Sequence, residues 1–167
     1  MKTQCHNPYL PLWEHIPDGE PHVFEDRLYI FGSHDLENGN EFCEQDYVSW
    51  SAPLDDLSDW RYEGVIYRKD QDPYNVNVLP LYAPDVVQGR DGRYYLYYCI
   101  KFQDSINVAV CDTPAGQYEF YGRVQYKDGQ AMMENQTYDP SVICTEEGNF
   151  LYFGFAPCMI NIPRYKD

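Results

Sequence analysis

The fold is decided by a short pattern, Pro-x-Val, that occurs three times: Pro21-His22-Val23-Phe24, Pro84-Asp85-Val86-Val87 and Pro140-Ser141-Val142-Ile143. The first two copies start 63 residues apart and the last two 56. Each copy leads through a tight turn, marked by Glu-Asp, Asp-Gly or Glu-Gly, into an aromatic-rich stretch typical of a β-strand. Such repetition indicates a fold made of repeated units, so the three copies predict three equivalent hairpins.

The later part of the unit also repeats. Residues 48–53 (VSWSAP) match 108–114 (VAVCDTP), and residues 60–65 (WRYEGV) match 118–124 (YEFYGRV). Four strands per unit, the first short and buried and the last rich in exposed side chains, are typical of a β-propeller blade. We therefore predict an all-β chain with a first blade at about residues 17–70, a second at about 80–130 and the start of a third at about 137–167. An antiparallel sandwich is the alternative, although the repeat argues against it.

Composition supports a folded β domain and excludes some partners. The 167 residues include six alanines against twelve prolines, and no long window keeps a helical period. Twelve basic and 27 acidic residues give a formal charge of −15, which opposes binding to nucleic-acid phosphates or anionic membranes. No apolar stretch approaches the ~20 residues of a membrane span, and none at the start is typical of a signal peptide. We therefore expect no nucleic-acid partner, no membrane partner and a cytoplasmic location.

The six cysteines are expected to be reduced, because no export signal accompanies them and none forms a C-x-x-C pair. Cys99, Cys111 and Cys144 lie in apolar or β-like runs, where a thiol packs as a small hydrophobe. The four histidines all lie in the first forty residues without ligand spacing. Phosphate loops, dinucleotide fingerprints and nucleophile elbows are absent from the sequence. The sequence thus contains no metal-ligand or cofactor motif, and it gives no basis for predicting a cation in the channel.

An aspartate lies near the start of each unit. Asp18 comes three residues before the first Pro-x-Val, Asp85 directly follows the second proline, and Asp139 directly precedes the third. The first strand of each propeller blade lines the central channel, so we expect these side chains to meet at the channel mouth. Carboxylates held together raise at least one pKa, and glycoside hydrolysis needs a base beside a group of raised pKa. A turn carboxylate that bonds its own backbone is the simpler interpretation, and it stays open for Asp85.

Several motifs, in order along the chain, resemble glycoside hydrolase family 43: IPDGEPHVF (16–24), SHD (33–35), DLSDW (56–60), YAPDV (82–86) and YDPSV (138–142). The resemblance covers about residues 7–157. It implies a five-bladed propeller of inverting enzymes that act on arabinose- and xylose-containing saccharides, of which this chain holds about two and a half blades. The sequence departs from the family pattern at two positions, since Gly19 replaces the usual proline and Tyr82 the usual tryptophan.

The resemblance also implies roles for individual residues. Asp18 matches the general base that deprotonates the attacking water. Asp139 matches the carboxylate that tunes the pKa of the general acid and orients it. The residues expected to hold the sugar or border its pocket are Tyr82, Asp85, His34 and Asp35. A buried His34 that is satisfied by its own loop is the competing interpretation.

The general acid of the family is a glutamate, and we match none in this chain to it. Glu146 and Glu147 are expected in the turn of the third unit, away from the channel mouth, and Glu41, Glu44 and Glu134 in loops. We therefore expect hydrolysis of α-L-arabinofuranosyl or β-D-xylosyl linkages, with a saccharide-binding or interaction fragment that lacks the acid as the alternative. An open propeller edge is also expected to favour self-association.

Overall fold

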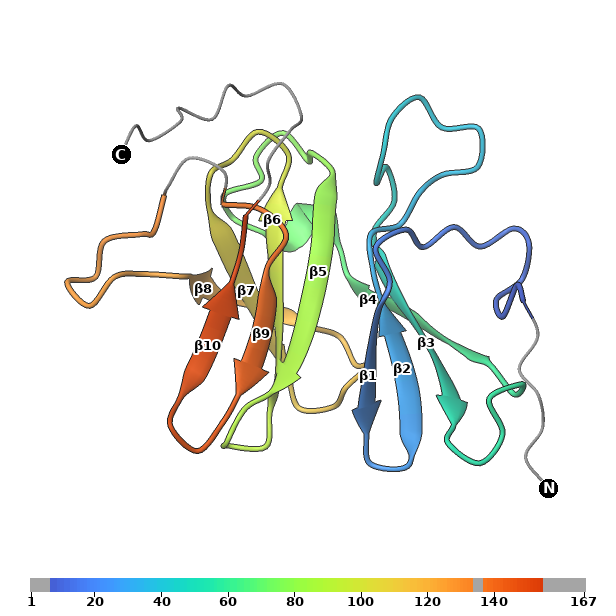
Figure 1. Ribbon diagram of the computed structural model, residues 1–167. Coiled ribbons are helices and arrows are strands. Elements are labelled where there is room, and N and C mark those ends of the chain that lie inside the picture. Colours follow the sequence, from blue (N-terminus) through green and yellow to red (C-terminus); the bar gives the residue numbers. More distant parts are fainter. Residues whose placement is uncertain (1–6, 134–136, 155–167) are drawn as a thin grey trace, which may run out of the picture.

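The computed structural model describes residues 7–133 and 137–154, and the regular elements within them are strands apart from one short helical turn. The strands form two four-stranded antiparallel sheets and one two-stranded sheet (Figure 1). The all-β prediction is confirmed. Cys5, Cys158 and Glu134, which the sequence singled out, lie outside the described residues.

The first sheet follows the chain in simple order. Its strands are β1 (Glu20–Phe24), β2 (Arg27–Phe31), β3 (Tyr47–Pro53) and β4 (Arg61–Tyr67). The predicted Glu25-Asp26 turn joins β1 to β2, and Glu25 has a φ of 54°, the left-handed conformation that a two-residue hairpin turn requires. The sequence pattern therefore located both the strands and the turn.

The second and third sheets repeat this order. The strands of the second are β5 (Leu81–Gln88), β6 (Tyr94–Ile100), β7 (Ile106–Cys111) and β8 (Glu119–Arg123), and those of the third are β9 (Ser141–Cys144) and β10 (Asn149–Tyr152). Among the described residues, the one helical element, η1 (Lys69–Gln71), lies between β4 and β5 along the chain. No helix in the described ranges is long and apolar enough to cross a membrane.

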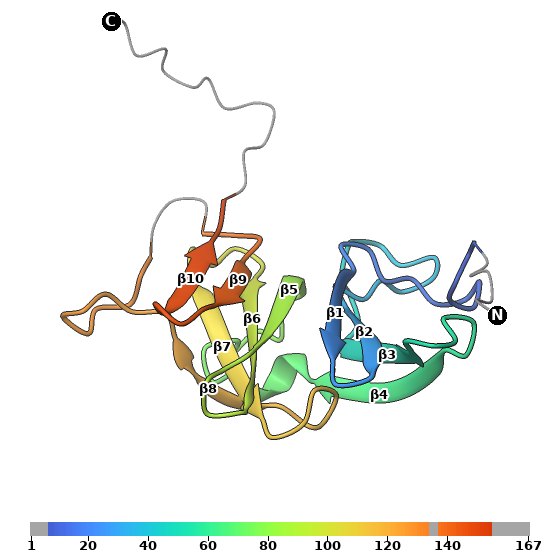
Figure 2. The same cartoon turned by 60° about the horizontal axis from the view of Figure 1, so that its bottom comes forward.

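The first strands of the three sheets lie next to one another, with β5 between β1 and β9 (Figures 1 and 2). We expected the first strand of each unit to be buried. This holds for β5, in which Leu81 and Val86 have no exposed surface, but it is wrong for β1, in which Val23 is 56% exposed. The reason is that β5 lies between β1 and β9, the first strands of the two other sheets, and contacts both of them.

The main core lies between the first and second sheets and is rich in aromatic side chains. Phe24 meets Tyr94 edge to face, with ring centroids 4.9 Å apart. The hydroxyls of Tyr67 and Tyr98 lie 2.8 Å apart, and that of Tyr98 donates to Asp72 at 2.5 Å. These buried polar groups are satisfied across the interface, which fixes how the two sheets pack. The four described cysteines, Cys43, Cys99, Cys111 and Cys144, are free thiols.

Candidate active site

Asp18 and Asp139 both lie just before a first strand, in backbone conformations that side chains rarely adopt. Asp18 has a φ of 54° in the turn before β1, and Asp139 has a φ of 51° before β9. Ala83 of β5, which precedes its proline as Asp139 does, has a φ of 31°. Left-handed backbone at residues other than glycine costs energy and clusters at functional sites. The backbone therefore marks the same region in all three units.

The structure brings the carboxylates of Asp18 and Asp139 into electrostatic contact, although 121 residues separate them in sequence. Burial raises the pKa of Asp139, and the negative charge of Asp18 raises it further. Both residues remain exposed, so water and a solute can reach them. The pair thus offers a carboxylate of raised pKa beside a second carboxylate.

Tyr82 contributes an aromatic ring next to this pair. Burial raises the pKa of its hydroxyl, and Cys43, Tyr138 and Cys99 raise it further, so all three side chains lie close to it. The Cys99 thiol also contacts the backbone oxygen of Tyr82 at 3.5 Å. Since Tyr138 directly precedes Asp139, the half-buried Tyr82 ring lies beside the segment that carries this carboxylate.

Two buried thiols pack beneath the carboxylates. Burial raises the pKa of Cys99 to about 12, although a hydrogen bond from the backbone N–H of Asp139 lowers it in part. Burial likewise raises the pKa of Cys43 to about 11, and the charge of Asp18 contributes to the increase. Both thiols are therefore protonated at neutral pH and serve as packing groups under the site.

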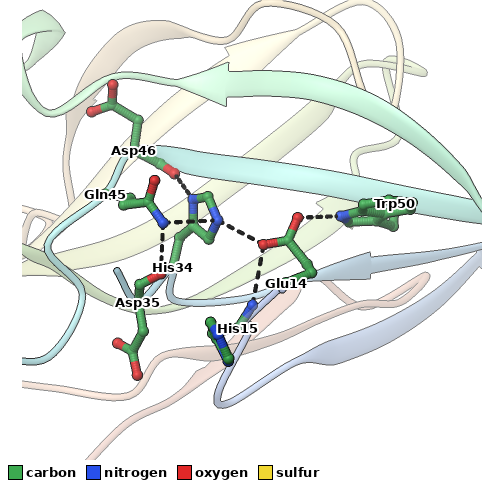
Figure 3. Close-up of polar contacts among 7 residues, drawn as sticks. All are labelled: Glu14, His15, His34, Asp35, Gln45, Asp46 and Trp50. Carbon is green, nitrogen blue, oxygen red and sulfur yellow. Dashed lines mark hydrogen bonds and ion pairs between the residues drawn. The ribbon is translucent and has the colours of Figure 1, made fainter. Parts of the chain in front are cut away.

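His34 lies in a buried polar network rather than at the carboxylate pair (Figure 3). Its Nδ1–H donates to the backbone oxygen of Asp46 at 2.8 Å, and its Nε2 lies 2.8 Å from Oε1 of Glu14. The other oxygen of Glu14 accepts the indole N–H of Trp50 at 2.7 Å. The backbone oxygen of Asp46 can only accept, so Nδ1 of His34 carries a proton. The short contact between Nε2 and the Glu14 carboxylate then needs a second proton, which the ring and the acid share.

Both ring nitrogens of His34 therefore have hydrogen-bond partners within the protein. This agrees with the competing interpretation, in which His34 is a buried histidine that bonds its neighbours rather than a sugar. The Glu14 side chain is only 3% exposed. It comes four residues before Asp18, so the network ties the segment that leads to Asp18 onto the first sheet. Asp35 also bonds within the protein, since its Oδ1 accepts the backbone N–H of Cys43 at 2.7 Å.

Asp85 is buried among protein groups, with 3% of its side chain exposed. Its Oδ1 accepts Nε2–H of His22 at 2.6 Å and the backbone N–H of Val86 at 2.8 Å. Its Oδ2 accepts the backbone N–H of Val142 at 2.6 Å. The expected contact between Asp85 and a sugar has no support in this geometry, because protein donors surround the carboxylate.

The described glutamates considered above lie away from the pair or bond elsewhere. Glu146 and Glu147 are in the turn between β9 and β10. Glu41 forms an ion pair with Lys101, and Glu44 accepts backbone N–H groups of its own loop. Across residues 7–133 and 137–154, no three His, Cys, Asp or Glu side chains group closely enough to hold a metal ion.

Comparison with known proteins decides the family. The sequence model of glycosyl hydrolases family 43 matches residues 19–160. This chain belongs to glycosyl hydrolase family 43. It is 58% identical over 162 residues to a xylosidase/arabinosidase of Thermoclostridium stercorarium, an alignment that covers 94% of this chain and 34% of the relative. It is 32% identical to a xylosidase/arabinosidase of Bacteroides ovatus, with 92% of this chain and 47% of the relative covered.

Solved structures of family 43 enzymes have the same fold. The GH43_1 enzyme of Xanthomonas citri complexed with xylose superposes with a TM-score of 0.67 at 29% identity, over 87% of this chain and 41% of that one. A β-xylosidase/α-arabinofuranosidase from a compost metagenome gives 0.66 at 27% identity, over 90% and 46%. The predicted β-propeller class is confirmed, and the chain spans about a third to a half of the length of these relatives.

Sequence reasoning on this family 43 chain missed four neighbours of the site. Tyr138, Cys43 and Cys99 surround Tyr82, and Glu14 anchors the segment before Asp18. Tyr138 had a visible signal, because it stands before Asp139 as Tyr82 stands before Ala83 in the parallel motif. The other three have no such signal, since their roles depend on contacts between segments distant in sequence.

Proposed function

We propose that this chain forms part of a glycoside hydrolase that cleaves β-D-xylosyl or α-L-arabinofuranosyl linkages with inversion at the anomeric carbon. The observation that carries the proposal is the pair Asp18 and Asp139, exposed at the ends of two first strands, with the pKa of Asp139 raised. The names of the relatives, xylosidase/arabinosidase, support the substrate class.

In the proposed reaction the Asp18 carboxylate accepts a proton from a water molecule while the water oxygen attacks the anomeric carbon. The bond from that carbon to the leaving oxygen breaks, and a general acid protonates this oxygen. Because water enters opposite the leaving group, the anomeric configuration inverts. Asp139 would orient the acid and keep its pKa high through the negative charge it carries when ionised. We assign the acid to no described residue.

Tyr82 is proposed to hold the sugar at this position. Its half-buried ring offers a flat apolar face for the sugar, and its hydroxyl can bond to a sugar hydroxyl. The backbone of Tyr82 is held in place, because its oxygen accepts the hydroxyl of the fully buried Tyr47 at 3.0 Å. This bond fixes the point on β5 from which the ring projects.

A second candidate function is saccharide binding without efficient hydrolysis. Within the described ranges, Asp18 is the acid whose charge raises the pKa of Asp139, and no glutamate contributes. Loss of general-acid assistance slows a reaction by about 10²–10⁴-fold. We therefore expect the 167-residue chain by itself to bind xylo- or arabino-oligosaccharides and to hydrolyse unactivated ones very slowly.

The test uses a hybrid protein in which these residues replace the matching third of the Thermoclostridium stercorarium relative. Turnover of 4-nitrophenyl xyloside and arabinofuranoside is measured for the hybrid, for Asp18→Asn and for the control Asp56→Asn, a turn aspartate that bonds Ser58. Asp18→Asn should lose about 10²-fold or more, while Asp56→Asn should match the parent.

Two results would contradict the proposal. Unchanged turnover in Asp18→Asn would remove the base assignment, and a product that first appears with the retained anomeric configuration, observed by proton NMR, would remove the inverting mechanism. A folded hybrid that binds xylotriose without hydrolysing it or either 4-nitrophenyl glycoside would favour the saccharide-binding function instead.

A further inference from the structure

Groups from all three sheets converge on the carboxylate of Asp85. His22 donates from β1, Val86 from β5 and Val142 from β9, at 2.6, 2.8 and 2.6 Å respectively. Hydrogen bonds to an ionised acceptor are short and roughly twice as strong as neutral ones. Asp85 therefore links three strands that share no backbone hydrogen-bond ladder with one another.

The sequence repeat explains how these groups meet. His22 and Asp85 both occupy the middle position of Pro-x-Val, one in each of the first two units. A β-bulge interrupts β5 between Tyr82, which pairs with Cys99 of β6, and Asp85, which pairs with Tyr97. Cys99 and Tyr97 are two residues apart, so Tyr82 and Asp85 lie on the same face of β5, with Asp85 one step further along the strand. The three-strand junction thus lies one step along β5 from Tyr82, whose ring lies close to Tyr138 in the segment that carries Asp139.

Strand β9 depends on this junction more than the other first strands do. It is four residues long, its sheet has two strands within residues 137–154, and both Ser141 and Ile143 are exposed. An isolated two-stranded hairpin is only marginally stable in water. The attachment of β9 to β5 within the described residues includes the buried Val142 side chain and the bond from its N–H to Asp85.

We propose that Asp85 is a positioning residue whose carboxylate clamps β9 against β5 and β1 and thereby holds Asp139, three residues before Val142, beside Asp18. Only the consequence for hydrolysis rests on the proposed function, since the clamp itself is a property of the fold. An aspartate is required rather than an asparagine, because all three partners are donors. An amide NH2 at either oxygen position would face an N–H instead of accepting it.

The first readout is amide hydrogen exchange in the 167-residue chain. Asp85→Asn should accelerate exchange of the Val142 N–H by about 10-fold or more, the effect of losing one charge-assisted hydrogen bond. The matched control is Asp72→Asn, a change of another buried aspartate, which accepts the hydroxyl of Tyr98 and the N–H of Tyr74. This control removes the charge from a comparable buried hydrogen bond in the core but should leave Val142 exchange unchanged.

The second readout is the titration of Asp139, followed by the carboxyl ¹³C shift. The groups that face Asp139 are the Asp18 carboxylate and the Cys99 thiol that its backbone N–H bonds. When β9 loosens in Asp85→Asn, burial and repulsion from Asp18 both decrease, so the titration midpoint should fall. Asp72→Asn should leave it in place. In the hybrid enzyme the same loosening should lower kcat with little change in KM.

Unchanged Val142 exchange and an unchanged Asp139 midpoint in Asp85→Asn would overturn the clamp, as would equal changes in Asp72→Asn. If Asp85→Asn does not fold, His22→Gln and His22→Ala replace it. Glutamine keeps an N–H donor for Asp85 and alanine does not, so equal Val142 exchange in the two variants would also overturn it. A parent hybrid without turnover would contradict the hydrolase proposal and leave both readouts of the clamp available.

Discussion

Replacement of Glu14 tests whether the buried network sets the stability of the first sheet. In Glu14→Ala, His34 Nε2 and Trp50 Nε1 both lose the carboxylate that they contact. Removal of one member of a buried, hydrogen-bonded ion pair costs about 3–5 kcal/mol. In a domain of this size that corresponds to a fall in Tm of roughly 6–20 °C.

Glu14→Gln should behave very differently. The glutamine oxygen can accept the Trp50 N–H, and its NH2 can donate to Nε2 of a neutral His34 whose Nδ1–H still bonds Asp46. The bond lost is the 3.2 Å contact in which Oε1 of Glu14 accepts the backbone N–H of His15. A neutral network of the same shape often matches a buried ion pair in stability, so we expect a change of under about 1.5 kcal/mol. The chemistry of the contacts, rather than their number, makes the difference between the two variants.

The assay is urea unfolding at pH 7 followed by tryptophan fluorescence, with calorimetric Tm as a second measure. The control is Asp70→Asn, which breaks the exposed ion pair with Arg68 and should leave Tm unchanged. Equal losses in Glu14→Gln and Glu14→Ala would refute the hydrogen-bond assignment. Stability unchanged in both would refute the anchoring role of Glu14.

Three further outcomes are expected. A Cβ at position 32 would lie 2.9 Å from the backbone oxygen of Pro17, so Gly32→Ala should displace Asp18 and lower turnover of the hybrid, whereas Gly122→Ala, which meets open space, should not. The pKa of Asp139 is raised above 3.8 in the folded protein, so the folded state favours the protonated acid and loses stability as the pH rises from 3.8 through the raised pKa. Calorimetry should therefore show a higher Tm for Asp139→Asn than for the parent at pH 7, but not near pH 2. With a pKa of about 11 and 4% exposure, Cys43 should resist a thiol reagent at pH 8 until the chain is unfolded in urea, as mass mapping would show.

The strands and their order could be predicted because they depend on local sequence. Alternating Tyr, Val, Ile and Phe favour a pleated surface with one buried face, and the Glu25-Asp26 and Glu147-Gly148 pairs favour tight turns between them. The aromatic-rich stretch that follows the first turn forms β2, and the one that follows the third turn forms β10. A repeated pattern also carries its own check, since each copy supports the interpretation of the others.

The environment of each aspartate could not be predicted in the same way. Asp18, Asp85 and Asp139 look alike in sequence, and we expected all three at one level of the channel mouth. Two are exposed and coupled, whereas Asp85 is buried and hydrogen-bonded. The sequence held a hint, because Asp85 follows its proline and Asp139 precedes it, so the two do not occupy equivalent positions of the repeat.

The sequence by itself determined the repeated four-strand unit, the family motifs and the candidates Asp18 and Asp139, because hydrophobic periodicity and turn chemistry act over a few residues. Only the tertiary structure decided that Glu14 anchors the segment leading to Asp18, that His34 bonds Glu14, and that Asp85 joins three sheets. These roles depend on which donors and charges face a side chain across intervals of 20 to 63 residues. Burial and hydrogen bonding belong to the packed neighbours, so they follow from how the sheets meet.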